Sequence, residues 1–146
     1  MKKYMPIIMA IVIGIIFGNI IFNSYEEEAV MSNDGSIYIL QYGAYTNESV
    51  LKENIKTLAN DSYIVDKVLD TYYVYFGVTT NYYNALNIVK LYEDKGIFLY
   101  IKENYLGKTN LINKLKTLDS LIKNESNNEM VLNYAKESLT IYQNNY

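Results

Sequence analysis

Two stretches of the chain repeat the same order of apolar, glycine and polar positions, 34 residues apart. The first ends with Tyr42-Gly43-Ala44-Tyr45-Thr46-Asn47, and the second ends with Phe76-Gly77-Val78-Thr79-Thr80-Asn81. In both, a β-branched and aromatic run stops at a Gly, and residues with helical spacing follow the Thr-Asn pair. Each stretch is typical of a strand, a turn and a helix. The correspondence continues without a gap as far as Val65 and Leu99, which favours two copies of one β-α-β unit.

Alternation along the strands assigns their side chains to two faces of a sheet. Strands are predicted at residues 37–45, 63–69, 72–78 and 97–104, with helices at residues 47–60 and 82–95. We therefore expect an α+β fold, a pseudo-symmetric βαββαβ repeat with a four-stranded antiparallel sheet. Two helices can cover only one face of such a sheet, so the other face should lie open. By alternation, the open face should carry Ile39, Gln41, Tyr73, Tyr75, Phe98 and Tyr100.

The pattern beyond Gly107 is helical only, which predicts a C-terminal helical extension at residues 106–146. Apolar residues from Leu111 to Ile122 recur at helical spacing, and residues 126–129 have the form of a capping box for a second helix. We expect a helical hairpin that packs on the preceding domain, self-associates or folds on a partner. If the hairpin packs over the aromatic side chains of the open face, that face becomes core instead of a binding surface.

The N-terminal residues 1–25 have the pattern of a single transmembrane anchor. Residues 6–22 are almost entirely apolar, and with their flanks they reach the roughly 20 residues that span a bilayer. Two Lys precede this stretch and three Glu follow it, so the positive-inside rule predicts a cytoplasmic N-terminus and an extracytoplasmic C-terminal domain. A cleaved signal peptide is the alternative. Residues 26–35 are polar and predict a short linker to a domain at residues 36–105.

The composition excludes several kinds of chemistry. The 146 residues contain no Cys and no His, which removes disulfides, thiolate nucleophiles, ordinary zinc sites and the commonest general base. Acidic residues fall mostly on predicted helices or near turns, so we expect no catalytic pair, no metal site and no cofactor. After the two N-terminal lysines the chain has an excess of about five negative charges, which opposes nucleic acid as a partner.

The first and third predicted strands carry motifs that resemble those of a known family. Leu40-Gln41-Tyr42-Gly43-Ala44-Tyr45 is similar to the apolar-Gln-apolar-Gly-small-aromatic first strand of the sporulation-related repeat (SPOR) domain of bacterial envelope proteins. Residues 72–77 resemble its third strand, with Tyr73 and Tyr75 where the family usually has Arg. The resemblance covers residues 36–103. It implies a βαββαβ domain whose open sheet face binds peptidoglycan glycan strands without stem peptides, in cell division, sporulation or wall remodelling.

An open aromatic face also suits a sugar polymer on chemical grounds. The C–H face of a pyranose ring packs on a Tyr or Phe ring, and a Gln amide both donates and accepts hydrogen bonds. We therefore predict a membrane-anchored, non-catalytic protein that binds peptidoglycan glycan strands. Its predicted glycan-binding residues are Gln41, Ile39, Tyr73, Tyr75, Phe98 and Tyr100. The alternative is a protein-interaction subunit of an envelope or division complex that has the same fold without binding glycan, and uses the C-terminal helices to bind its partner.

Overall fold

The computed structural model describes residues 35–107 and 109–145 of the chain. Within these residues, no helix combines the length and the apolar character needed to cross a bilayer. The predicted anchor and nearly all of the predicted linker lie outside the described residues.

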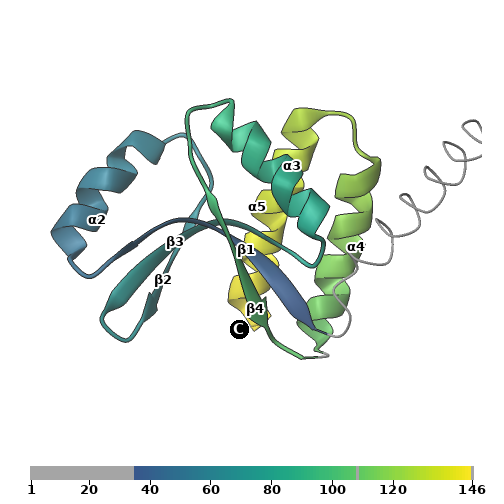
Figure 1. Ribbon diagram of the computed structural model, residues 1–146, viewed down its shortest axis with the longest axis horizontal. Coiled ribbons are helices and arrows are strands. Elements are labelled where there is room, and N and C mark those ends of the chain that lie inside the picture. Colours follow the sequence, from purple (N-terminus) through teal and green to yellow (C-terminus); the bar gives the residue numbers. More distant parts are fainter. Residues whose placement is uncertain (1–34, 108, 146) are drawn as a thin grey trace, which may run out of the picture. The chain divides into compact units, whose positions relative to one another are not determined.

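The described residues form an α+β fold with a four-stranded antiparallel sheet and four α-helices (Figure 1). The sheet order is β2-β3-β1-β4, so each of the two β-α-β units leaves a gap that a strand of the other unit fills. The predicted order βαββαβ, followed by two helices, is confirmed. The elements are β1 (Ser36–Tyr45), α2 (Glu48–Ile55), the 3₁₀ helix η1 (Lys56–Leu58), β2 (Ile64–Val68), β3 (Thr71–Thr79), α3 (Tyr82–Glu93), β4 (Tyr100–Tyr105), α4 (Asn110–Asn124) and α5 (Asn128–Asn145).

The two central strands, β1 and β3, are related by the sequence repeat down to their irregularities. Their register shifts between Leu40 and Gln41, which leaves Phe76 as an extra residue on β3, and between Gln41 and Gly43, which leaves Tyr42 as an extra residue on β1. Tyr42 and Phe76 are the equivalent residues of the two copies, and their ring centroids lie 5.9 Å apart. The two bulges therefore bend the two copies alike.

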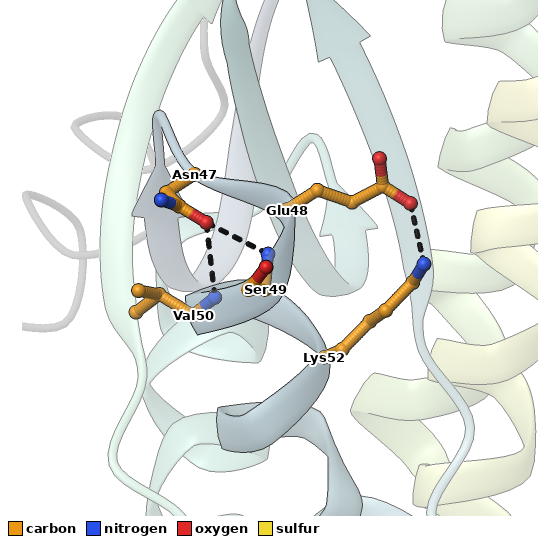
Figure 2. Close-up of polar contacts among 5 residues, drawn as sticks. All are labelled: Asn47, Glu48, Ser49, Val50 and Lys52. Carbon is orange, nitrogen blue, oxygen red and sulfur yellow. Dashed lines mark hydrogen bonds and ion pairs between the residues drawn. The ribbon is translucent and has the colours of Figure 1, made fainter.

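Both repeat helices begin at an Asn with the same conformation. Asn47 (φ −117°, ψ 121°) precedes α2, and Asn81 (φ −117°, ψ 118°) precedes α3. Each side chain accepts hydrogen bonds from backbone N–H groups two and three residues further on, which have no partner inside the helix. Figure 2 shows this cap at Asn47, together with the exposed ion pair that joins Glu48 to Lys52 one turn further on. The Thr-Asn pair that precedes each helical pattern in the sequence therefore marks the start of each helix.

One face of the sheet packs against α2, η1 and α3, as the alternation predicted. Leu40, Val74 and Phe76 point to this side, where Phe76 is fully buried and its ring lies 4.9 Å from that of Tyr92 on α3. The helix residues that share this core include Leu51, Leu58, Ala85 and Ile88.

The opposite face was expected to be open, and this expectation is wrong for half of it. Ile37, Ile39, Tyr75 and Val78 of this face form a second buried core with α4 and α5. Leu115 of α4 is fully buried there. The helical pattern had indicated that α4 and α5 bury an apolar side, and the sheet supplies the surface that covers it.

The C-terminal helices also contribute residues to the core that contains Phe76, and they contact it beside the end of β3. β2 pairs with β3 only over residues 71–75. Beyond that point α5 takes the place of a strand: the backbone N–H of Val78 donates a hydrogen bond of 2.9 Å to the Ser138 hydroxyl. Ile122, Val131 and Ala135 belong to the same core as Phe76. The described residues accordingly form one compact unit, and α4 and α5 are integral to it.

The start of α5 differs in detail from the predicted capping box. Asn127, not Ser126, accepts the hydrogen bonds from the N–H groups of Glu129 and Met130. The Glu125 carboxylate in turn accepts a hydrogen bond from the Asn127 N–H. The helix boundary therefore lies one residue later than the Ser-to-Glu spacing indicated. An Asn caps a helix as well as a Ser does.

Candidate functional site

Five of the six residues predicted to bind glycan share one face of the sheet, and Phe98 lies just before the start of β4; the six differ widely in exposure. Ile39 and Tyr75 are 2% and 4% exposed, so neither is available to a ligand. Gln41 and Tyr73 are partly exposed. Phe98 and Tyr100 are 66% and 71% exposed. The continuous aromatic face expected from the sequence is therefore corrected to an open part, in which Tyr100 is the most exposed strand residue of the six, and a part covered by helices.

The covered part is held by aromatic and apolar contacts with the C-terminal helices. The ring of Tyr75 meets Tyr142 of α5 edge-on, with centroids 6.3 Å apart. Leu139 and Tyr142 from α5, and Leu111 and Leu115 from α4, are each 4% exposed or less. Burying a large apolar side chain contributes roughly 1.5 to 3 kcal/mol, so these four together hold the hairpin firmly on the sheet. Exposing Tyr75 to a ligand would require most of this energy to be given up.

A buried polar cluster fixes α4 to the end of β3 and the start of α3. The Asp119 carboxylate on α4 is 7% exposed and accepts hydrogen bonds from Thr79, from both the N–H and the hydroxyl of Thr80, and from the Asn84 amide. The Asn84 amide also donates to the Asp119 backbone carbonyl at 3.0 Å. Four donors, from the end of β3, the turn after it and α3, replace the water that a carboxylate loses on burial. Asp119 is therefore a structural residue that joins α4 to the second repeat.

The open part of the face, together with the exposed Phe98 just before β4, is a narrow patch that we call the aromatic strip. Its sheet residues are Gln41, Tyr73, Tyr100 and Lys102. Gln41 lies between two rings in register, with Tyr100 of β4 on one side and Tyr75 of β3 on the other. The ring of Tyr73 stacks on that of Tyr75, with centroids 6.1 Å apart, and so continues the covered aromatic cluster into the open part. The strip offers flat apolar rings, one amide and one cation.

Gln41 has an unusual polar atom. Its side-chain oxygen is buried and has no hydrogen-bond partner among the described residues. A buried acceptor without a partner is uncommon in folded proteins, because its desolvation costs free energy that nothing offsets. The Gln41 amide is thus the polar group of the strip with unused hydrogen-bonding capacity.

Lys102 supplies the only cation among the strip's side chains. Its ammonium lies 5.1 Å from the centroid of the Tyr73 ring. The ion pairs of the described residues join Glu48 to Lys52 and Asp61 to Lys95, so Lys102 has no carboxylate partner there. An exposed cation–π contact of this kind is worth only about 0.5 to 1 kcal/mol. Lys102 can exchange it for a stronger partner.

Three tyrosines, Tyr38, Tyr45 and Tyr92, pack in the core on the face covered by α2 and α3. Burial raises the pKa of Tyr38, with a smaller contribution from the nearby Glu103 carboxylate. Burial also raises the pKa of Tyr45, and it raises the pKa of Tyr92 to about 12. These phenols are neutral at physiological pH, and none has the lowered pKa of an activated acid or base.

The described residues offer no cluster of side chains that could hold a metal ion. No three His, Cys, Asp or Glu side chains of residues 35–107 and 109–145 come together in a way that could hold a metal ion. A shallow groove of about 240 Å³ lies between α5 and the loop before β2, with Asp61, Lys95 and Lys136 in its walls. Asp61 and Lys95 already pair there at 3.1 Å, so we assign no chemistry to this groove.

Two residues of this region were missed by the sequence reasoning, although the sequence held a signal for each. Lys102 follows Tyr100 by two positions and so shares its face of the strand. Asp119 occurs at a helical spacing from Leu115 and Ile122, on the apolar side of α4, where a carboxylate needs dedicated partners.

Comparison with protein-family models, with curated proteins and with solved structures finds no match to this chain. The resemblance to the SPOR domain therefore rests on the strand motifs and stays a prediction.

Proposed function

We propose that this chain is a non-catalytic binding module for glycan strands, held at the membrane by its N-terminal segment with its C-terminal domain outside the cytoplasm. The ligand class is the sugar backbone of peptidoglycan without stem peptides, as the resemblance to the SPOR domain implies. The binding surface is the aromatic strip. It is smaller than the surface expected from the sequence, because α4 and α5 occupy the rest of the face.

The exposure of Tyr100 is the observation that carries the proposal. A tyrosine that is 71% exposed on a sheet strand has a bare ring face, and a pyranose ring can pack on it through its C–H groups. The Gln41 amide beside it can hydrogen-bond the acetamido groups of the sugar. Phe98, two residues before Tyr100, offers a second ring for the next sugar of the glycan strand.

Retention on purified cell-wall sacculi tests the proposal. The full-length chain, in a detergent without a sugar head group, is incubated with sacculi before and after an amidase has removed the stem peptides. We expect retention on the amidase-treated wall, and a loss of about tenfold in apparent affinity for Tyr100→Ala. Tyr105→Ala is the matched control, since Tyr105 lies on the same strand, is 68% exposed, and points to the opposite face. No retention, or an equal loss with Tyr105→Ala, would contradict the proposal.

A second candidate function, protein interaction, is favoured by the turn between β2 and β3. Leu69 has φ +56° there, a conformation that suits Gly or Asn, and its side chain is 89% exposed. Val68 beside it is 48% exposed. The positive φ of Leu69 and the exposure of the two apolar side chains both cost free energy, and no contact within the described residues compensates for that cost. Backbone strain of this kind is concentrated at binding sites. An apolar pocket on a partner protein would accept these two side chains.

The variant Leu69→Gly separates the two candidates. Removing the strain should raise the free energy of unfolding by about 1 kcal/mol, while glycan retention stays unchanged. Under the second candidate, cross-links formed in cells from a photoreactive residue at position 70 should disappear in Leu69→Gly and persist in Tyr100→Ala. The reverse pattern would exclude protein interaction through this turn.

A further inference from the structure

We infer that Lys102 recognises a carboxylate on the bound sugar, and that without ligand its side chain covers the Gln41 amide. This inference rests on the proposed glycan binding and adds the charge of the preferred sugar. It assigns Lys102 as a specificity residue and Gln41 as a hydrogen-bonding residue that becomes accessible when the ligand binds.

The strand register shows that Lys102 reaches across the sheet. On β4, Lys102 lies opposite Ile39 of β1. On the other side of β1, Tyr73 lies opposite Ala44. The Lys102 ammonium nevertheless lies 5.1 Å from the centre of the Tyr73 ring. To reach that ring, the Lys102 side chain crosses β1 between Ile39 and Ala44, the segment that holds Gln41.

This crossing accounts for the burial of the Gln41 oxygen. The oxygen points to the sheet face that carries the strip, yet it is shielded from water and has no hydrogen-bond partner among the described residues. The rings of Tyr75 and Tyr100 flank Gln41 in register, and the Lys102 side chain covers it from above. Since burial of an unpaired acceptor is unfavourable, a ligand that moves Lys102 also relieves this cost.

A carboxylate is the group that would move Lys102. The ammonium is held by an aromatic ring and by no carboxylate of the described residues. A charge-assisted hydrogen bond to a carboxylate is stronger than an exposed cation–π contact. Glu103, its neighbour on the chain, lies on the opposite face of β4 and leaves the charge of Lys102 free for a ligand.

The spacing on β4 suits an acidic sugar. Tyr100 and Lys102 lie two residues apart on the same face, roughly 6.6 Å along the strand. A ring stacked on Tyr100 would place its substituent near Lys102. In peptidoglycan the N-acetylmuramic acid residue carries a lactyl carboxylate, which is free only when the stem peptide is absent. Lys102 would therefore distinguish bare glycan strands from glycan strands that carry peptides. Once Lys102 has moved, the Gln41 oxygen becomes accessible and accepts a hydrogen bond from an acetamido N–H of the sugar.

Binding of defined oligosaccharides tests the inference. The probes are a neutral N-acetylglucosamine tetramer, a tetramer that alternates it with N-acetylmuramic acid, and the same alternating tetramer with its carboxylates converted to methylamides. Isothermal titration uses the full-length chain in a detergent without a sugar head group. We expect the free-carboxylate tetramer to bind about tenfold more tightly than the other two at low salt, and the preference to shrink as salt rises.

The variant Lys102→Gln should abolish the preference, so that the three tetramers bind with equal affinity. Lys67→Gln is the matched control, because the Lys67 ammonium lies 4.8 Å from the ring centre of Tyr72 on the opposite face. The methylene protons of Lys102 provide a direct readout: the Tyr73 ring should shift them upfield without ligand, and the carboxylated tetramer should remove that shift.

The two proposals fail differently in this experiment. If no tetramer binds, the glycan-binding function is overturned, and the role of Lys102 with it. If all three bind equally, or if Lys102→Gln retains the preference, glycan binding stands and only the assignment of Lys102 is overturned.

Discussion

In the first copy of the repeat, Gly43 lies under the ring of its own neighbour Tyr45, whereas in the second copy Gly77 lies under Ala135 of α5. A methyl group added at Gly43 would come within 2.6 Å of the Tyr45 hydroxyl, and one added at Gly77 would lie 3.4 Å from the Ala135 methyl. The residue equivalent to Tyr45 in the second copy is Thr79, which is fully buried. A small side chain at this position leaves room for a helix, and a large one fills the space itself.

The same contrast continues into the two repeat helices. Thr46 and Val50 are exposed in the first copy, while their equivalents Thr80 and Asn84 are buried and donate hydrogen bonds to Asp119. Figure 1 shows α2 and α4 at opposite ends of the sheet. The two copies, with corresponding strands, bulges and caps, therefore have different roles. The second copy binds the C-terminal helices through its buried Thr80 and Asn84, and the equivalent residues of the first copy are exposed.

Asp119→Ala should have the largest effect on this contrast. It leaves the buried donors of Thr79, Thr80 and Asn84 without their acceptor, and we expect a loss of about 3 kcal/mol in the free energy of unfolding. Urea denaturation monitored by circular dichroism measures it. Asp70→Ala, at an exposed turn of the first hairpin, should change stability by less than about 0.5 kcal/mol. Equal effects of the two variants would contradict the docking role of Asp119.

Tyr92 should make the second copy sensitive to alkaline pH, since its equivalent in the first copy is Leu58. The phenol of Tyr92 loses its proton near pH 10 in the unfolded chain and near pH 12 in the folded one. Between these values the unfolded state binds fewer protons, so stability falls as the pH rises, by about 2 to 3 kcal/mol at most.

Tyr92→Phe should remove this part of the pH dependence and leave stability at pH 7 nearly unchanged. The measurement is the free energy of unfolding from pH 8 to 12 for both proteins. Parallel curves would show that the Tyr92 hydroxyl does not contribute.

Gly77→Ala and Gly43→Ala should each cost about 1 to 2 kcal/mol, for different reasons. The Gly77 methyl would press on Leu40 at 3.2 Å and on Ala135, so the companion change Ala135→Gly should reduce the cost. The Gly43 methyl would displace the Tyr45 ring, so Tyr45→Ala should reduce that cost instead. Thermal denaturation of the four single and two double variants forms two double-mutant cycles. An unchanged cost of Gly77→Ala in the Ala135→Gly background would contradict the assignment.

Asn47→Ala and Asn81→Ala should have the smallest effects, and nearly equal ones. Each removes a side-chain cap with two hydrogen bonds, which typically costs about 1 kcal/mol. The ion pair between Glu48 and Lys52, seen in Figure 2, is exposed to solvent, so Lys52→Ala should produce no measurable change. A loss at Asn81 several times that at Asn47 would show that the second cap also supports the Asp119 cluster.

The sequence by itself determined the repeat, the start of each repeat helix after its Thr-Asn pair, the order of the elements and, for the strands other than β2, the face to which the side chains point. These features are set by neighbours a few residues apart, through the period of a strand or a helix and the hydrogen bonds of a helix start. The strand boundaries were less well determined: β4 begins at Tyr100 instead of residue 97, because Ile97 and Leu99 enter the core without pairing to β1.

Only the tertiary structure decided which surface the C-terminal helices cover. An apolar stripe on α4 requires burial but does not specify the partner surface. That choice depended on the short pairing of β2, which leaves the end of β3 free, on the small residues Gly77 and Thr79, and on the four donors around Asp119. The same docking buried Tyr75 and left Tyr100 exposed. Contacts between residues 35 to 60 positions apart make this selection, and no local period in the sequence records them.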